Sequence, residues 1–324
     1  MYDKGDLLEK IRELDLAGSY VSGADMACHT SIRAGGRADA LILPESISEI
    51  VKVAVLCKKK RFPLLVIGNG TNILARDGGV RGAVMKLGGR LNGLRREGDR
   101  IVAGAGALLA DAARFAAGQG LSGLEFARGI PGSVGGAVCM NAGAYGTEMK
   151  DAVYRTVYLD ADGSVCLIDN IGHCFEHRGS WFQGQKCIIL ETEFRLAHGD
   201  PKQIEQKMAE LGRLRAESQP LDMPSAGSAF KRPPGGHAAP MIEACGLKGY
   251  SIGGAAVSEK HAGFIVNTGG ATAGDIVQLI SHIKKCVRRK FGVSLQTEIR
   301  IVGENAEMPR RGMAGRSAGN GAEV

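Results

Sequence analysis

The sequence has little of several features that mark common protein classes. Only 9 Phe, 6 Tyr and 1 Trp occur among its 324 residues, which leaves few rings on which nucleic-acid bases could stack. The eight cysteines are scattered and form no C-x-x-C pair, a pattern typical of free thiols in a reducing cytoplasm. The dipeptide Gly-Lys never occurs, so the sequence contains no P-loop for nucleotide phosphates.

The sequence also lacks an apolar run that could cross a membrane. Its longest uncharged stretch, residues 129–147, contains Pro131 and six glycines and therefore predicts a loop. Near the N-terminus, Leu7, Leu8, Ile11 and Leu14 recur at helical spacing among charged residues. This pattern indicates an amphipathic helix, not a signal peptide, so we expect a cytoplasmic protein without a membrane partner.

The charge pattern and the candidate metal ligands do not indicate a specific partner. The net charge is +7, but the basic runs at 58–61 and 284–290 end predicted helices, where cations favourably meet the helix C-terminus. We therefore expect solvated helix ends and no nucleic-acid partner. His173, Cys174 and His177 could supply three zinc ligands, yet their spacing matches no standard zinc motif, so no metal is expected.

Glycine is the residue present in excess. The 48 glycines are about twice the roughly 7% of an average protein, while the apolar content of 44% is ordinary. The glycines follow no three-residue period, which excludes collagen, and the apolar content is high enough to build a core. The surplus must serve local needs.

The order of predicted elements indicates alternating strands and helices. Residues 40–43 predict a strand, the capping box from Ser46 to Glu49 opens a helix, and residues 64–67 predict the next strand. This order is an α/β unit. Further strands are expected at 82–87, 100–103, 153–159, 164–168, 186–196, 262–267 and 294–302, and further helices at 108–117, 201–217 and 272–291. Asp162-Gly163 predicts a hairpin between the strands 153–159 and 164–168. Asp200-Pro201 predicts an N-cap and a first helical proline, and Thr272-x-x-Asp275 predicts a capping box.

Two segments concentrate the glycines, namely 68–72 directly after a predicted strand and 129–146. Glycine allows backbone N–H groups to converge on a ligand without obstruction by a Cβ atom, so either segment could cradle a pyrophosphate. Tight turns and close backbone packing explain the same composition equally well. A third run, Gly104-Ala-Gly106, imitates a dinucleotide fingerprint but has Leu109 at the third glycine position, and so predicts only a turn.

Five separated motifs carry a resemblance to a known family. His29–Gly36, Gly68–Leu74, Gly129–Gly146, Gly227–Gly235 and Gly249–Asn267 are similar, in this order, to motifs of the UDP-N-acetylenolpyruvoylglucosamine reductases. The resemblance spans about residues 20–304. The short stretch between Arg178 and Ser228 resembles the branch that lacks an extra tyrosine-bearing loop.

The resemblance implies an α+β fold with four parts. Residues 33–198 would form an FAD-binding domain of the vanillyl-alcohol-oxidase (PCMH) type, in two subdomains divided near residue 90, and residues 199–304 an α/β substrate-binding domain. Residues 1–32 would lead into the first domain, and 305–324 look like a disordered tail. The implied non-covalent contacts with FAD come from Gly68, Asn69, Gly70, Thr71, Asn72, Gly132, Ser133, Gly135, Gly136, Asn141, Gly143 and Gly146.

The implied reaction is reduction of an enolpyruvyl ether on a UDP-sugar, with NADPH as hydride donor, in peptidoglycan synthesis. Hydride addition creates negative charge that a cation or acid must stabilise, and a separate donor must protonate the neighbouring carbon. The family match assigns the first task to Arg178 and Glu298 and the proton to Ser228. Lys231 and Arg232 would contact the UDP-sugar.

Each catalytic assignment has an ordinary alternative. Arg178 could form a surface ion pair with Glu176 or Asp169, Ser228 could be a turn residue, and Glu298 could face solvent beside Arg300.

The sequence also departs from the family pattern at two places. His177 stands where relatives commonly have tyrosine, and Ala239-Pro240 where they often have Gly-Lys. Rival functions are a flavoprotein oxidase of the same domain type and a regulator that binds UDP-sugars without catalysis.

Overall fold

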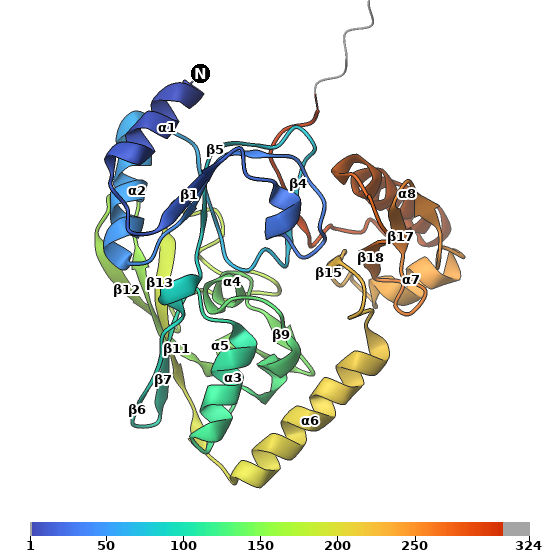
Figure 1. The fold of residues 1–324 in the computed structure, drawn as a ribbon. Coiled ribbons are helices and arrows are strands. Elements are labelled where there is room, and N and C mark those ends of the chain that lie inside the picture. The colour runs from blue at the N-terminus through green and yellow to red at the C-terminus, as the bar shows by residue number, and fades with distance from the viewer. Residues whose placement is uncertain (1, 307–324) are drawn as a thin grey trace, which may run out of the picture.

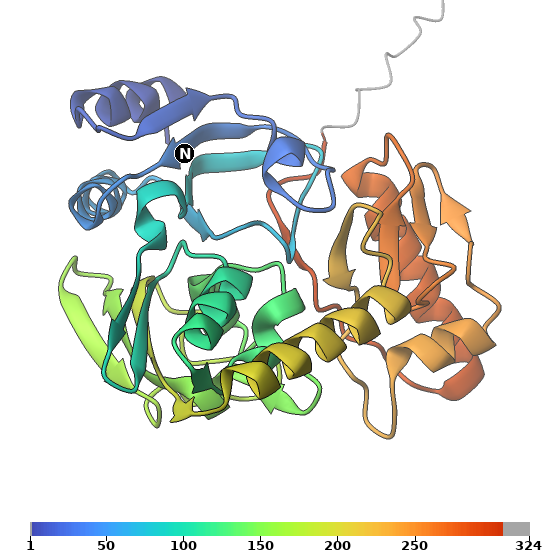
Figure 2. The same cartoon turned by 60° about the horizontal axis from the view of Figure 1, so that its bottom comes forward.

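A computed structural model describes residues 2–306 and arranges them in three sheet-based parts (Figure 1). The helix α6 (Pro201–Ser218) runs from the second part to the third, and Figure 2 shows it extending along the molecule toward the C-terminal lobe. Asp200 caps this helix and Pro201 occupies its first position, as the sequence predicts. The tail predicted from residue 305 lies, beyond residue 306, outside the described residues.

The first part is a four-stranded sheet in the order β1-β2-β5-β3, covered by α1 and α2. The central strands β2, β5 and β3 are parallel, and β1 joins the edge antiparallel to β2. Ser46 accepts a hydrogen bond from the backbone of Glu49, which confirms the predicted helix start. The predicted capping box is only half formed, because the Glu49 carboxylate accepts from the backbone of Ala17 and Glu45 and not from that of Ser46. The bounds are α1 Lys4–Glu13, β1 Ser19–Ser22, β2 Ala38–Leu43, α2 Ile47–Lys60, β3 Leu64–Ile67 and β5 Val80–Lys86.

The second part is a five-stranded antiparallel sheet in the order β12-β11-β13-β7-β6. The predicted hairpin is confirmed, since β11 and β12 pair with Leu159 opposite Val165. Helices α3 and α4 pack beside β7, and the turn from β7 into α3 contains Gly106, while Gly104 is the last residue of β7. The bounds are β6 Leu94–Glu97, β7 Arg100–Gly104, α3 Leu109–Gly118, α4 Val134–Cys139, α5 Met149–Ala152, β11 Val153–Leu159, β12 Val165–Asp169 and β13 Ile188–Arg195.

The glycine segment 129–147 was predicted to be a loop, and this prediction is wrong for its centre. Residues Val134–Cys139 form α4, whose N-cap Ser133 accepts a hydrogen bond from Gly136 N. A Cβ atom on Gly135 would lie 2.9 Å from the Cβ of Ala105, so the close approach of α4 to the β7–α3 turn requires glycine there. Tertiary packing therefore stabilises a helix that the composition disfavours.

The third part is a four-stranded sheet in the order β15-β18-β17-β16 with α7 and α8. The predicted capping box at the start of α8 is present, with Thr272 and Asp275 each bonding the other's backbone. The core of this part also includes Ile32 and Leu74 of the N-terminal half. The bounds are β15 Ser225–Ser228, α7 Ala238–Ala244, β16 Ser251–Ile252, β17 Ala255–Val257, β18 Phe264–Asn267 and α8 Ala273–Phe291.

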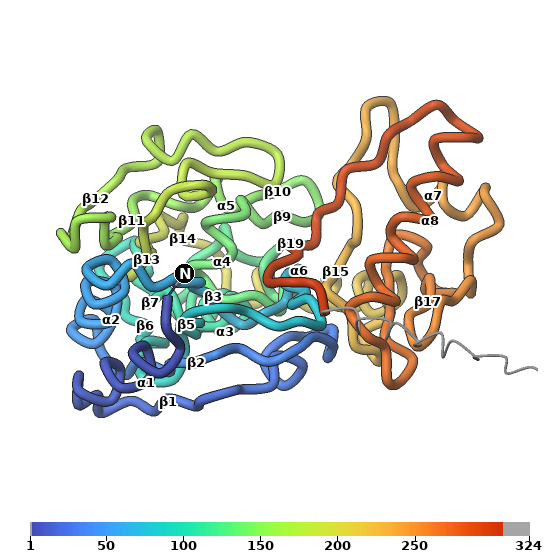
Figure 3. The backbone as a smooth tube through the Cα atoms, turned by 90° about the horizontal axis from the view of Figure 1, so that it is seen from above, coloured from blue at the N-terminus to red at the C-terminus, as the bar shows by residue number. Residues whose placement is uncertain are grey.

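After α8 the chain returns to the N-terminal half, as Figure 3 shows. Here β19 (Arg300–Val302) pairs in parallel with β4 (Ile73–Ala75). The predicted strand 294–302 is therefore too long, because residues 294–299 form only one isolated bridge, between Thr297 and Phe230. The returning segment nevertheless brings residue 298 beside the loop that precedes β4.

The first two sheets share one large hydrophobic core. Leu7 of α1, Ile42 of β2, Met85 of β5, Ile101 of β7 and Phe194 of β13 are all at most 1% exposed within it. Short pairs of strands complete the frame, β8 (Leu121–Ser122) with β14 (Ala197–His198) and β9 (Gly143–Ala144) with β10 (Thr147–Glu148). Across residues 2–306, no helix combines the length and the apolarity needed to cross a membrane.

Candidate active site

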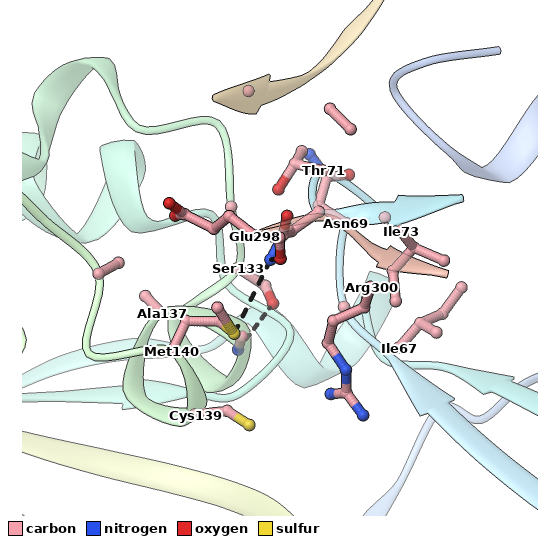
Figure 4. A pocket seen from close by; sticks show the side chains of 18 of the residues that line it. Ile67, Asn69, Thr71, Ile73, Ser133, Ala137, Cys139, Met140, Glu298 and Arg300 are labelled. Carbon is pink, nitrogen blue, oxygen red and sulfur yellow. Dashed lines mark hydrogen bonds between the residues drawn. The ribbon is translucent and has the colours of Figure 1, made fainter. Parts of the chain in front are cut away.

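A cavity of about 1920 Å³ is lined by residues from all three parts of the fold. Its walls include both glycine segments, the turn around Arg178, the end of α6 and β15. Figure 4 shows Asn69 and Thr71 of the first glycine segment, Ser133 of the second, and Glu298 and Arg300 of the returning segment gathered around one space. The volume exceeds the roughly 300–1,000 Å³ typical of a single small-ligand pocket, so it can hold more than one bound molecule.

The first glycine segment lies in the cavity wall at the end of β3. A Cβ atom on Gly68 would lie 1.9 Å from Ser133 Oγ, so the two glycine segments touch at this point. Gly70 has a φ of +69°, and a Cβ atom there would meet the carbonyl oxygen of His29 at 2.1 Å. Asn69 Nδ2 also donates to the Pro131 carbonyl at 2.7 Å, which fixes the two segments against each other.

The backbone of these segments offers hydrogen-bond donors to the cavity. Within residues 2–306, the N–H groups of residues 68–72, 132 and 133 donate to no protein acceptor. Clustered backbone N–H groups without bulky side chains are the donor set that suits a pyrophosphate. The residues present therefore fit the phosphate groups of a dinucleotide such as FAD.

The three predicted catalytic residues line the same cavity, and Glu298 lies next to the first glycine segment, since Asn72 Nδ2 donates to the Glu298 carbonyl at 3.2 Å. Arg178 Nε lies 3.0 Å from Glu298 Oε1, and their side chains are 26% and 17% exposed. The β15 segment runs beside residue 298, because Glu298 N donates to the Ala229 carbonyl and Lys231 N donates to the Gln296 carbonyl. Ser228 thus lines the same cavity, with its Oγ donating to the Phe230 carbonyl at 3.2 Å.

The ordinary alternatives for Arg178 and Glu298 do not describe this arrangement. The ion-pair partner of Arg178 is Glu298, not Glu176 or Asp169, and Glu298 is largely buried. Burial raises the pKa of Glu298, while the positive charges of Arg178 and Lys231 oppose that rise. A carboxyl group with a raised pKa beside a guanidinium can hold a proton near the cavity.

The other predicted site residues differ in whether they line the cavity. Residues 68–72, Gly132, Ser133, Gly135, Gly136, Gly143 and Arg232 line the cavity. Among the described residues, Asn141, Gly146 and Lys231 are not part of its lining. Asn141 is fully buried behind the wall, and its side chain bonds only to protein groups.

The departure at His177 lies in the cavity lining next to Arg178. Burial lowers the pKa of His177, and the positive charges of Arg178, Arg232 and Lys231 lower it further against the opposing charge of Glu148. The second departure is internal to α7, where Pro240 occupies the first turn and lines the cavity.

The sequence did not indicate two cavity residues at the end of α6. Arg215 in the last turn of α6 and Gln219, the residue that follows this helix, both line the cavity. Within residues 2–306, Arg215 Nε and Gln219 Oε1 are buried without a hydrogen-bond partner. Burial lowers the pKa of Arg215. Arg300, which also lines the cavity, was considered only as a partner for Glu298.

The zinc alternative finds no support in the described part of the chain. Residues 2–306 contain no group of three or more His, Cys, Asp or Glu side chains that could hold a metal ion. His173 is buried, with Nε2 2.8 Å from Thr156 Oγ1 and its ring stacked on Phe175.

Two family models match separate ranges of the chain, and both ranges contribute residues to the cavity. An FAD-binding domain model matches residues 38–169, and the model of the UDP-N-acetylenolpyruvoylglucosamine reductase C-terminal domain matches residues 219–302. The UDP-N-acetylenolpyruvoylglucosamine reductase of Caldanaerobacter subterraneus subsp. tengcongensis is 47% identical over 298 residues, which cover 92% of this chain and 98% of the relative. The chain belongs to the UDP-N-acetylenolpyruvoylglucosamine reductase family.

Further relatives extend this result. The reductase of Clostridium botulinum is 48% identical over 279 residues, covering 86% of this chain and 91% of the relative. The crystal structure of UDP-N-acetylenolpyruvylglucosamine reductase from Thermus caldophilus superposes with a TM-score of 0.77 at 34% identity, covering 89% of this chain and 100% of that one. The predicted α+β fold and the predicted class, an FAD-dependent reductase of peptidoglycan precursor synthesis, are confirmed.

Proposed function

We propose that this chain reduces UDP-N-acetylenolpyruvoylglucosamine to UDP-N-acetylmuramate in the cytoplasm, with NADPH as hydride donor and FAD bound non-covalently. Its partners would be these small molecules alone, without nucleic acid, membrane or metal. The observation that carries the proposal is that Arg178, Ser228 and Glu298 line the same cavity as the two glycine segments.

The domains divide the work in this proposal. Residues 33–198 hold FAD, residues 199–304 carry the substrate-binding surface, and residues 1–32 lead into the first domain, with β1 completing the first sheet and α1 packing on its core. The N–H groups of residues 68–72 and 132–133 contact the FAD pyrophosphate, because they point to no protein acceptor. Ser133, Gly136 and Gly143 line the adjoining wall. When bound, FAD relays a hydride from NADPH to the terminal carbon of the enolpyruvyl group.

Arg178 orients the substrate and stabilises the charge that develops on it. Its Nε is engaged by Glu298 and its Nη2 donates to the Gly143 carbonyl at 3.4 Å, which leaves Nη1 and the second N–H of Nη2 for the substrate carboxylate. A fixed, permanently charged fork favours the enolate that forms when hydride adds to the neighbouring carbon. Arg232 lies in the same lining and supplies positive charge for the UDP portion, and Lys231 adds a positive charge that acts on Glu298.

Ser228 and Glu298 handle the proton. The Ser228 hydroxyl can leave its weak bond to the Phe230 carbonyl and donate a proton to the carbon next to the carboxylate, which completes the addition of hydride and proton across the double bond. Serine is a weak acid, so the nearby charge of Lys231 must stabilise its deprotonated form. When Glu298 takes up a proton, it can donate a hydrogen bond to the enolate, a role consistent with the direction of its pKa shift.

Absorbance spectroscopy tests the proposal directly. The purified protein should be yellow, NADPH should bleach the flavin absorbance without oxygen, and the enolpyruvyl sugar nucleotide should restore it. Rapid restoration by oxygen alone would favour a flavoprotein oxidase. A colourless protein that binds UDP-sugars would favour a regulator and contradict the proposal.

A further inference from the structure

The backbone of Arg178 adopts a conformation that arginine rarely takes. Its φ is +59°, in the left-handed region, and it lies in the turn Glu176–Gly179. This turn is closed by two backbone hydrogen bonds of 3.1 Å, in which Glu176 and Gly179 each donate to the other's carbonyl. A non-glycine residue keeps such a conformation only where its surroundings fix it, and such residues concentrate at functional sites.

The surroundings that fix this turn come from the C-terminal end of α4. Asn141 Nδ2 donates to the Glu176 carbonyl at 3.0 Å, and Ser180 Oγ donates to the Cys139 carbonyl at 2.9 Å. Gln183 Nε2 lies 3.3 Å from the Cys139 carbonyl and 3.0 Å from the carbonyl of Arg178 itself. We call Asn141, Ser180 and Gln183 the Arg178 clamp.

Asn141 is the most deeply buried member of this clamp. Its side chain is 0% exposed, and its φ of +42° is one that asparagine tolerates better than most residues. Besides the Glu176 carbonyl, Nδ2 donates to Glu148 Oε2 at 3.0 Å, and Oδ1 accepts from Lys150 N at 3.0 Å. Both N–H groups of the amide are therefore used inside the protein, which leaves no side-chain donor for a ligand.

We propose that Asn141, Ser180 and Gln183 are positioning residues that fix the backbone of Arg178, so that its guanidinium meets both Glu298 and the substrate carboxylate. The inference rests on the proposed function, because it assigns the clamp to the step in which Arg178 acts. It replaces the expected cofactor contact of Asn141 with a role exerted through Arg178. Since Ser133 starts α4 and the clamp holds its end, one short helix links the pyrophosphate loop to Arg178.

The substitution Asn141→Asp tests this role because it changes only the donor groups. The new carboxyl group can still accept from Lys150 N, but when ionised it places an oxygen near the carbonyl of Glu176 and the carboxylate of Glu148. Those contacts are repulsive, and the charges that face the position, Glu148, Lys150 and Arg178, do not remove them. A proton on the new carboxyl group restores one hydrogen-bond donor. The variant enzyme should therefore lose less activity, relative to wild type, as the pH falls.

The variants should affect the two half-reactions differently, namely the reduction of the flavin by NADPH and its reoxidation by the substrate. With Asn141→Asp, FAD content and the rate of flavin reduction by NADPH should stay within about twofold of wild type. Reoxidation of the reduced enzyme by the enolpyruvyl sugar nucleotide should slow by about 10- to 100-fold at pH 8, and by clearly less at pH 6. Gln183→Ala, which removes the donor to the Arg178 carbonyl, should slow the same step without the pH dependence.

Asn170→Asp is the matched control. Asn170 also donates from its amide to two backbone carbonyls, those of Lys150 and Val153, but makes no hydrogen bond to the clamp. Its substitution should leave both half-reactions near wild type. A similar loss in Asn170→Asp would show that destabilisation alone explains the effect.

Other outcomes overturn the inference in recognisable ways. Loss of FAD from Asn141→Asp, with normal reoxidation of the flavin-loaded fraction, would make Asn141 a cofactor residue. Unchanged reoxidation in both clamp variants would show that Arg178 needs no clamp. As a readout apart from activity, the NMR resonance of the Arg178 Nε–H should shift in both variants and not in the control. If wild type itself fails to reduce the substrate, the proposed function fails, whatever the variants do.

Discussion

The contact between the two glycine segments allows a quantitative test of the proposed pyrophosphate loop. In Gly68→Ala, the added methyl carbon would lie 1.9 Å from Ser133 Oγ and 3.0 Å from Ser133 Cβ. Ordinary contact begins at 3.4 Å, so the first separation must grow by 1.5 Å, which is 3.4 − 1.9. Rotation of the serine hydroxyl alone leaves the tight contact with Cβ, so one of the two segments must move.

The movement should weaken both folding and FAD binding. If Ser133 turns away, α4 loses its N-cap bond from Gly136 N, which costs about 1 kcal/mol. A hydrogen bond from a backbone N–H to a charged phosphate contributes about 2 kcal/mol, and a shift of this size removes at least one. The dissociation constant for FAD should therefore rise about 30-fold, since about 1.4 kcal/mol corresponds to a factor of ten.

Titration of the apoprotein with FAD, followed by flavin fluorescence, measures this constant. Gly118→Ala is the control, because a Cβ atom there meets nothing within 4 Å. Adding Ser133→Gly to Gly68→Ala removes the clash and should restore part of the affinity. Wild-type affinity in Gly68→Ala would refute the assignment of this loop.

Three further predictions concern the Arg178–Glu298 pair. Arg178→Lys should retain FAD and its reduction by NADPH, but reoxidation of the flavin by the substrate should slow by about 100-fold. The reason is that a lysine cannot bind Glu298 and a carboxylate through one planar fork. Stopped-flow absorbance measures each step, and an equal loss in both steps would contradict the proposed role of Arg178. The rate of reoxidation should fall as the pH rises through the raised pKa of Glu298, since only protonated Glu298 acts as an acid, and Glu298→Gln should remove this part of the pH profile. The folded protein holds the Glu298 proton more tightly than the unfolded chain does. The free energy of unfolding should therefore fall as the pH rises from the pKa of Glu298 in the unfolded chain through its pKa in the folded protein. This part of the pH dependence, measured by urea unfolding, should disappear in Glu298→Gln. An unchanged profile would mean that Glu298 does not titrate in this range.

Local sequence signals predicted the regular elements well because their causes are local. Ser46 and Thr272 start helices in the structure through the side-chain caps that their sequence context indicated. The helix at Val134–Cys139 escaped prediction because its glycines have low helix propensity, and its stability comes from packing of Gly135 on Ala105. The strand predicted at 294–302 was too long because alternation reports which side chains are buried and does not show where a partner strand ends.

The sequence motifs name residues that the structure brings to one cavity, but they do not predict how these residues contact one another. The motifs pointed to Arg178, Ser228 and Glu298, but the pairing of Arg178 with Glu298 joins residues 120 positions apart and depends on the return of the chain to β4. Asn141 was expected at the cofactor because it lies in a glycine-rich motif. Its left-handed backbone turns the amide into the protein instead, and sequence alone does not show that direction.

The central claim is that Ser228 supplies the proton in the reduction of the enolpyruvyl group. The most direct measurement is anaerobic stopped-flow reoxidation of the NADPH-reduced enzyme by the enolpyruvyl sugar nucleotide, compared between wild type and Ser228→Ala. We predict that the variant is yellow and is reduced by NADPH at the wild-type rate, but recovers its flavin absorbance orders of magnitude more slowly. Recovery at the wild-type rate would remove Ser228 from the mechanism and contradict the claim.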